Sequence, residues 1–153
     1  EHACFVSDAL GVMISGDQVL PRISSNVSVF PTEPDANPLG EWMDSITRLR
    51  ASLGGGLLVL PAHGEPFRGL HARLDRLALG HDRGLERLRR SLAEAPKRAI
   101  DVFGALFARP IDSTGDLLGM ATGESLAHLN CLIARGQAVC EPDSQGVRWY
   151  RLA

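Results

Sequence analysis

The sequence predicts an α/β segment in residues 1–67, a helical connection in residues 68–94 and a small α+β domain of winged-helix type in residues 95–153. Two patterns indicate this class. The first part alternates short apolar strands with one amphipathic helix, and the last part runs from helices into a hairpin. With 153 residues, net charge −2 and 44% hydrophobic residues, the chain suits one or two small domains and is too apolar for a disordered protein.

Charge and cysteine content separate the parts further and bound the compartment. Residues 1–67 hold three basic and eight acidic side chains, whereas residues 68–153 hold thirteen basic and ten acidic ones, so the two parts are expected to do different jobs. Cys4, Cys131 and Cys140 form no C-x-x-C pair, which predicts reduced thiols in a cytoplasmic protein. We expect no membrane partner, because no apolar run approaches the ~20 residues of a bilayer span and no secretory signal pattern is present.

The elements of the first part follow from short local signals. The apolar runs 5–7 and 12–15 flank a turn containing Gly11, which predicts a hairpin. The proline-rich stretch 31–38 is a loop that ends at Asn37-Pro38, a helix start with Asn as the cap and Pro in the first turn. Apolar residues three or four apart continue that helix: Leu39, Trp42, Met43, Ile46, Leu49 and Leu53. Three glycines then end the helix, and residues 57–60 form a fully apolar strand.

Three polar side chains lie at the ends of these predicted strands. His2 precedes the first strand, Asp17 follows the second and His63 follows the last. Two imidazoles and a carboxylate are suitable ligands for zinc or a similar metal, and loops at strand ends are where a scaffold presents such groups. Spacing alone leaves ordinary alternatives open: a free terminus for His2, a cap for Asp17 and a turn residue for His63.

The residues around these positions add a resemblance. Successive motifs of the metallo-β-lactamase superfamily are similar to Glu1-His2-Ala3-Cys4, Ser15-Gly16-Asp17-Gln18-Val19-Leu20 and Leu60-Pro61-Ala62-His63-Gly64. The resemblance implies the C-terminal half of an αββα sandwich that hydrolyses an ester, thioester or phosphodiester by a metal-bound hydroxide. By position it makes His2 and His63 ligands of different metal ions, and Asp17 the bridging ligand and catalytic residue. It implies two zinc ions in the intact enzyme, with iron or manganese as alternatives.

One expected motif is absent from the chain. The superfamily's opening H-x-H-x-D-H pattern does not occur, so we expect this to be the C-terminal part of a longer hydrolase. The N-terminal half of the fold would then be a partner that supplies further ligands and covers one side of the sheet. Without that half, we expect weak or absent metal binding and no catalysis. Ser24, Ser25 and Asn26 after Asp17 are expected to line the pocket, with plain turn residues as the alternative.

Residues 68–94 read as a helix with one apolar stripe. Its members are Leu70, Leu74, Leu77, His81, Leu85, Leu88 and Leu92. Gly80 and Gly84 each cost ~1 kcal/mol relative to alanine, which predicts a break or kink near residues 80–84. We expect His81 to be a packed or partly exposed histidine rather than a ligand. The arginine-rich faces are either solvated or able to contact phosphates.

After a boundary at Ala95-Pro96, the last part reads as helices followed by a hairpin. A helix is predicted over 97–108, with Ile100, Phe103, Leu106 and Phe107 facing inward. A second helical stretch runs over 116–135, where Gly123 is a candidate division and Gly136 a C-cap. Its predicted core stripe is Leu117, Leu118, Met120, Leu126, Leu129, Leu132 and Ile133. Segments 138–141 and 147–152 flank a turn-rich stretch and complete a winged-helix pattern.

A winged helix raises the alternative of nucleic-acid binding. Arg135 is the only basic residue of the recognition-helix segment, whereas Arg148, Trp149 and Arg151 on the last strand could contact a single strand or form an ordinary edge strand. A lactamase fold followed by a winged helix resembles lactamase-like endoribonucleases, and the central motifs are similar to glyoxalase II-like thioester hydrolases. The implied substrate is therefore a small ester or thioester, or RNA. The competing hypothesis is a winged-helix module without catalysis, which binds nucleic acid or a protein, including a second copy of itself in a homodimer.

Overall fold

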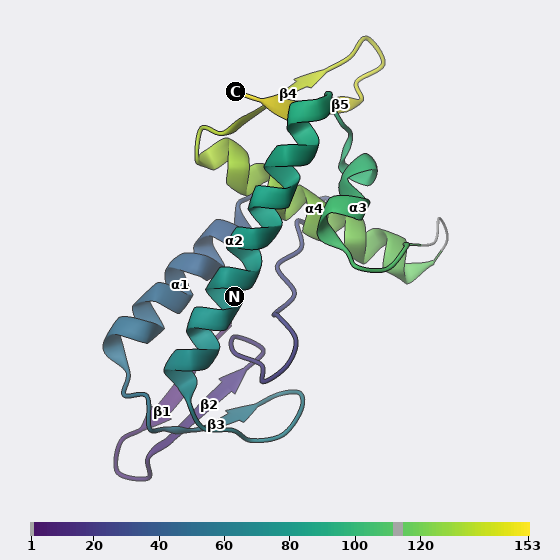
Figure 1. Ribbon diagram of the computed structural model, residues 1–153. Coiled ribbons are helices and arrows are strands. Elements are labelled where there is room, and N and C mark those ends of the chain that lie inside the picture. Colours follow the sequence, from purple (N-terminus) through teal and green to yellow (C-terminus); the bar gives the residue numbers. More distant parts are fainter. Residues whose placement is uncertain (1, 112–114) are drawn as a thin grey trace. The chain divides into compact units, whose positions relative to one another are not determined.

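The computed structural model describes residues 2–111 and 115–153, so Glu1 of the first motif lies outside the described residues (Figure 1). The chain divides into two compact units. Unit 1 comprises Glu1–Asn26 and Met43–Gly80, and unit 2 comprises Val27–Trp42 and His81–Ala153. The domain boundaries predicted after residues 67 and 94 stay predictions.

Unit 1 is built on a three-stranded sheet in the order β1-β2-β3. Strands β1 (Phe5–Ser7) and β2 (Val12–Gly16) are antiparallel, and the turn between them places Gly11 at φ 62°, which confirms the predicted hairpin. Strand β3 (Leu58–Pro61) pairs with β2 in parallel. Because β2 and β3 are parallel, their C-terminal ends meet at one edge of the sheet.

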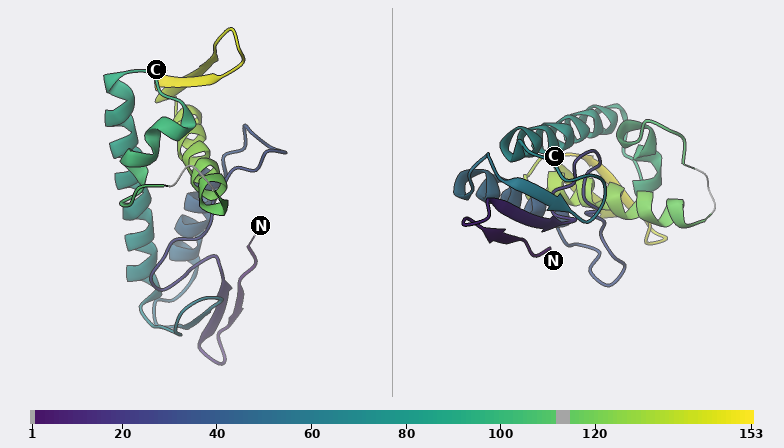
Figure 2. Two further views of the ribbon diagram at one scale, coloured as in Figure 1. Left: turned by 90° about the vertical axis from the view of Figure 1, so that its right-hand side faces the viewer. Right: turned by 90° about the horizontal axis from the view of Figure 1, so that it is seen from below.

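The two faces of this sheet differ in their exposure. Met13 and its partner Val59 are fully buried on one face, where segments of helices α1 (Pro38–Ser52) and α2 (Leu70–Glu94) lie along the sheet (Figures 1 and 2). On the opposite face Ile14 is 52% exposed and its partner Phe5 on β1 is 67% exposed. The sheet therefore has one packed face and one face with exposed apolar side chains.

The helices confirm one start signal and correct one predicted break. Helix α1 begins at Pro38, and the Gly40 amide donates to Asn37 Oδ1 at 3.1 Å, as the cap prediction requires. Helix α2 is continuous over its 25 residues, so a break near residues 80–84 is wrong, whereas the alternative of a kink there stays a prediction. The apolar stripe of the helix is buried along its length, and this burial outweighs a glycine cost of ~1 kcal/mol each.

The region after α2 is less helical than the sequence predicted. In place of one helix over 97–108, the chain forms a 3₁₀ turn, η1 (Ala99–Val102), and one helical turn, α3 (Phe103–Leu106). Ile100, which was predicted to face inward, is 46% exposed, whereas Val102 is fully buried. A 3₁₀ turn has three residues per turn rather than 3.6, so a stripe counted at the helical spacing selects the wrong residue.

Helix α4 (Asp116–Ala134) is undivided, so the expected division at Gly123 is wrong. Gly123 instead allows close approach, since a Cβ there would lie 2.8 Å from Ser28 Cβ and 2.9 Å from the Val29 carbonyl oxygen. The predicted stripe is also partly wrong because Leu117, Met120 and Ile133 are exposed. The buried face includes small and polar residues: Ala121, Ser125, Ala127, His128 and Asn130.

Unit 2 ends with an antiparallel hairpin of β4 (Ala138–Pro142) and β5 (Arg148–Leu152), as predicted. Gly136 follows α4 at φ 67°, the left-handed conformation expected of a helix C-cap. Tyr150 is the largest fully buried side chain of the hairpin, and burial raises its pKa to about 12. Within the described residues, no helix has the length and apolar character needed to cross a bilayer.

Candidate functional site

The candidate site lies where β2 and β3 end in unit 1. Gly16 closes β2 at φ 52°, Asp17 follows it, and the Ala62 amide donates to the Gly16 carbonyl oxygen at 3.0 Å. This bond ties the turn after β3, which carries His63, to the turn after β2. The parallel pairing of the two strands therefore brings together two side chains that are 46 positions apart in the sequence.

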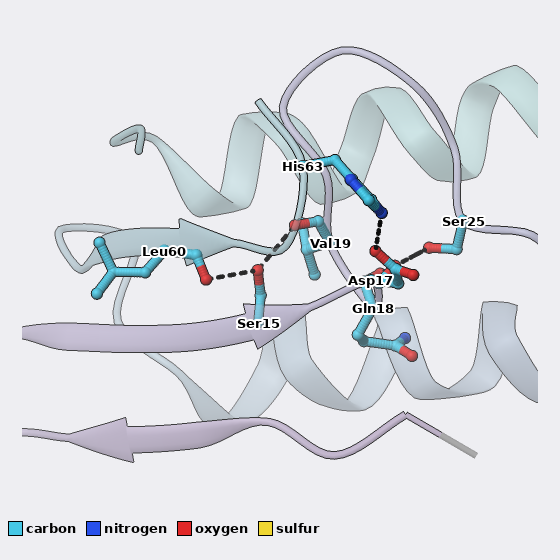
Figure 3. A network of polar contacts seen from close by, with 7 residues as sticks. All are labelled: Ser15, Asp17, Gln18, Val19, Ser25, Leu60 and His63. Carbon is cyan, nitrogen blue, oxygen red and sulfur yellow. Dashed lines mark hydrogen bonds and ion pairs between the residues drawn. The ribbon is translucent and has the colours of Figure 1, made fainter. Parts of the chain in front are cut away.

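Asp17 and His63 point toward each other (Figure 3). His63 Nε2 lies 3.4 Å from Asp17 Oδ1, and the two side chains are 67% and 46% exposed. The Oδ1 atom itself is buried and has no hydrogen-bond partner within the described residues, so its contact with the imidazole is close but not hydrogen-bonded. A buried carboxylate oxygen without a donor is an unsatisfied acceptor, and a bound cation would satisfy it.

Buried side chains hold the loop around Asp17. Ser25, which is 3% exposed, donates its hydroxyl to the Asp17 carbonyl oxygen and lies 3.1 Å from the Gln18 carbonyl oxygen. Ser15 Oγ donates to the Val19 carbonyl oxygen at 2.8 Å (Figure 3). Gln18 Nε2 donates to Ser45 Oγ at 3.1 Å. The backbone on both sides of Asp17 is therefore fixed from within the fold.

Two of the predicted pocket residues lie differently from Ser25. Ser24 and Asn26 are exposed, whereas the Ser25 hydroxyl is turned toward backbone carbonyls. Their part in a pocket stays a prediction. The Ser25 hydroxyl contacts the Asp17 and Gln18 carbonyl oxygens and therefore orders the loop that presents Asp17.

His2, the third predicted ligand, is exposed at the start of the described chain. Across residues 2–111 and 115–153, no group of three or more His, Cys, Asp or Glu side chains is arranged to hold a metal ion. Asp17 and His63 are thus a pair of suitable ligands. The separation of 3.4 Å between their atoms is close to the ~3.3 Å between two ligands of tetrahedral zinc with bonds of ~2.0–2.1 Å.

The residues predicted to contact nucleic acid lie in unit 2 and already have partners. Arg148 pairs with Asp35 at 2.6 Å and Arg151 pairs with Glu141 at 2.7 Å. Trp149 Nε1 donates to Asp143 Oδ2 at 3.0 Å, and the Arg98 guanidinium lies 5.6 Å from the centre of the indole. Arg135 lies 3.7 Å from Asp82. Each basic residue would have to exchange a carboxylate for a phosphate on binding.

A second polar cluster in unit 2 was not foreseen as a cluster. His81 is buried, as expected of a packed histidine, and His128 is buried beside it, with His81 Nδ1 3.4 Å from His128 Nε2. His128 Nδ1 lies 2.8 Å from the Glu124 carbonyl oxygen and must donate to it, so Nε2 accepts from His81. Burial is the main cause that lowers the pKa of His81 to about 4, and the nearby His128 acts in the same direction. Burial also lowers the pKa of His128, and neighbouring Arg87 acts in the same direction.

Sequence reasoning also missed Arg73 as a residue near the site. Its position falls on the apolar side of α2, three residues after Leu70 and four before Leu77. A charged residue on that side was the available signal.

The chain is similar to known proteins in both sequence and structure. Residues 85–153 match the sequence profile of the family described as metallo-beta-lactamase-like, C-terminal domain. The chain is 29% identical over 136 residues to "Probable metallo-hydrolase YqjP" of Bacillus subtilis (strain 168), covering 87% of this chain and 41% of that protein.

Two solved structures are also similar. A beta-lactamase domain protein from Burkholderia ambifaria is 45% identical with a TM-score of 0.89, covering 96% of this chain and 43% of that one. A metallo-beta-lactamase family protein from Thermus thermophilus is 28% identical with a TM-score of 0.82, covering 99% of this chain and 45% of that one. This α/β structure thus matches part of a metallo-β-lactamase fold, and the chain spans less than half the length of each of these relatives.

Proposed function

We propose that this chain, whose residues 85–153 match the metallo-β-lactamase-like C-terminal domain family, is the C-terminal part of a metal-dependent hydrolase. One observation carries the proposal. Asp17 Oδ1 is buried without a hydrogen-bond partner within the described residues, and it lies 3.4 Å from His63 Nε2 at the ends of two parallel strands. An unsatisfied carboxylate oxygen beside an imidazole supplies two of the ligands that a metal ion needs.

Zinc is the metal that this pair fits best, and iron or manganese would also accept a carboxylate and an imidazole. Asp17 and His63 would be two ligands, and His2 would be a third if its exposed segment moves toward them. When bound, the metal would lower the pKa of a water molecule toward ~7 and polarise the bond to be cleaved. Two ions would require further ligands, and these would come from the part of the fold that is present in the relatives but not spanned by this chain.

The residues of this chain would bind and orient. The Asp17 carboxylate, held by the Ser25 contact to its own backbone, would accept a proton from or orient the attacking water. His63 would fix the other side of the site. The substrate class that suits such a centre is an ester, a thioester or a phosphodiester, the last including RNA.

The exposed face of the sheet supports the view that the rest of the fold is a partner. Phe5 and Ile14 are cross-strand neighbours on that face, and both are more than half exposed. We propose that the other half of the sandwich covers them. Its packing would bring the remaining ligands to Asp17 and His63.

The test uses the full-length protein. Zinc content and hydrolysis of a thioester, an ester and a phosphodiester are measured for the wild type, Asp17→Ala, His63→Ala and the control Glu65→Gln. Glu65 is exposed and lies two residues after His63. We expect both site variants to lose metal and at least about 10²-fold in activity, and the control to keep both. A wild type without stoichiometric metal, or a His63→Ala variant with unchanged hydrolysis, would contradict the proposal.

A second candidate function is a winged-helix module that binds nucleic acid or a protein, including a second copy in a homodimer. The observation in its favour is that α4 leads into the β4–β5 hairpin, where Trp149 lies at an open hollow lined by Pro96, Glu141, Pro142, Asp143, Trp149 and Arg151. The pairing of Arg148 and Arg151 with carboxylates favours a protein partner over RNA. Salt-dependent retention of the chain on RNA, lost in Trp149→Ala, would support nucleic-acid binding.

A further inference from the structure

The loop that carries Asp17 depends on an arginine from a distant helix. Arg73 on α2 donates through Nε to the Leu20 carbonyl oxygen at 2.5 Å and through Nη2 to the Ile23 carbonyl oxygen at 2.7 Å. Both carbonyls lie in irregular backbone between β2 and residue 25, where no strand or helix satisfies them. One side chain therefore closes two backbone acceptors of this loop.

Burying the charged guanidinium of Arg73 costs free energy, and packing alone would not require a charged residue at this position. Its side chain is 9% exposed. Burial lowers the pKa of the guanidinium, and the nearby positive charge of Arg76 lowers it further. Its two bonded partners are neutral carbonyls rather than a carboxylate, so the charge is not neutralised by them. A leucine or methionine would fill the same volume without desolvating a cation. The geometry of the two bonds is what only arginine supplies, because its planar fork holds several donors in fixed directions.

The two bonds act on both sides of the candidate site. Pro21 lies between the two bound carbonyls, and its Cγ is 2.8 Å from the position that a Cβ at Gly64 would occupy. Gly64, at φ 83°, directly follows His63, so the Pro21 ring supports the turn that presents the imidazole. At the end of the same loop, Ser25 binds the Asp17 carbonyl oxygen.

We propose that Arg73 is a positioning residue that sets the relative placement of Asp17 and His63 through the loop of residues 17–25. Removing its guanidinium frees Leu20 and Ile23, loosens Pro21 from Gly64, and allows the carboxylate and the imidazole to separate. The part of this inference that concerns metal rests on the proposed function; the ordering of the loop does not.

The experiment compares Arg73→Gln, Arg73→Lys and Arg73→Ala, the last with and without guanidinium chloride, with the control Arg76→Gln in the full-length protein. Arg76 is an exposed arginine one turn further along α2. Zinc affinity is measured by competition with a chelator, kcat and KM are measured with the substrate identified for the wild type, and hydrogen exchange is followed at the amides of Gln18 and Ala62. These amides donate to the Ser15 and Gly16 carbonyl oxygens, next to Asp17.

We expect Arg73→Gln to bind zinc about 10- to 100-fold more weakly, to lose kcat with little change in KM, and to exchange both amides faster. Arg73→Lys keeps the charge but not the fork, so it falls between the wild type and Arg73→Gln. Arg73→Ala in low-millimolar guanidinium chloride regains zinc affinity, which a general packing defect would not do. Arg76→Gln resembles the wild type throughout.

Two results would overturn the inference, and neither coincides with failure of the proposed function. The first is wild-type zinc affinity and amide exchange in Arg73→Gln. The second, if Arg73→Gln does not fold, is a folded Arg73→Lys with wild-type zinc affinity. The proposed function fails instead when Asp17→Ala leaves zinc binding unchanged. Faster exchange in Arg73→Gln would then still establish the loop contact.

Discussion

Acid is predicted to destabilise unit 2 through one buried histidine. His81 is 6% exposed, its Nδ1 faces His128 Nε2, and its own Nε2 is buried without a hydrogen-bond partner within the described residues. A second proton on this imidazole would place a charge in a poorly solvated position. His128 is the titratable group that faces His81, and Arg87 acts on His128. The backbone carbonyl of Glu124 accepts from His128, and burial raises the pKa of the Glu124 carboxyl. Asp82, the next residue after His81, pairs with Arg135.

The magnitude follows from linkage. The pKa of His81 is about 4 in the folded protein and 6.5 in the reference state, so the unfolded chain binds more protons between these values. Stability is therefore fully present above about pH 6.5 and is lost as the pH falls toward 4. One pKa unit corresponds to about 1.36 kcal/mol, so His81 alone accounts for a loss of roughly 2–3 kcal/mol between roughly pH 7.5 and pH 4.5. His128 adds to this in the same direction.

Urea denaturation at a series of pH values measures this loss. His81→Asn keeps a donor near the position of Nδ1 and cannot titrate, so its free energy of unfolding should fall roughly 2–3 kcal/mol less than that of the wild type over the same range. Arg83→Gln, an exposed change two residues along α2, should retain the wild-type slope. A His81→Asn variant with the wild-type pH dependence would refute the reasoning, because the proton uptake would then occur elsewhere.

Three further predictions concern stability. Gly123→Ala should destabilise the protein by about 1–3 kcal/mol, because its Cβ would meet Ser28 and the Val29 carbonyl. Gly119→Ala in the same helix meets open space and should stabilise the protein by up to about 1 kcal/mol. Equal shifts of the two melting temperatures would contradict this. Ser25→Ala should cost about 1–3 kcal/mol and Ser24→Ala under about 0.5, as measured by urea denaturation, and equal costs would remove the assigned tether. Asn130→Ala frees the carbonyls of Pro34 and Ala36, which its Nδ2 binds at 3.0 and 2.8 Å, and should speed proteolysis within residues 27–36; an unchanged cleavage rate would argue against that contact.

Much of the structure of residues 1–67 could be predicted because its signals are local. Gly11 in a turn and Asn37-Pro38 before an amphipathic stretch each determine a structure within a few residues. Helix α4 could not be predicted at the same level. It contains few charged residues, so its sequence is apolar around most of its circumference and does not indicate which face is buried.

The candidate site shows the same division. Strand-end positions and the family resemblance indicated Asp17 and His63, and the structure places their side chains together, although their role as ligands stays a prediction. The contact of Arg73 with Leu20 spans 53 positions and that of His81 with His128 spans 47. No local pattern encodes such pairings, because they depend on how α2 packs within each unit. Only an arginine on the apolar side of a helix hinted at the first.

The most direct test of the central claim is a crystal structure of the zinc-loaded full-length protein, with the metal located by its anomalous scattering. We predict a zinc ion about 2.0–2.2 Å from an Asp17 carboxylate oxygen and from a His63 nitrogen, with Arg73 still bound to the loop. Zinc found away from both side chains, or absent from crystals grown with excess metal, would contradict the claim.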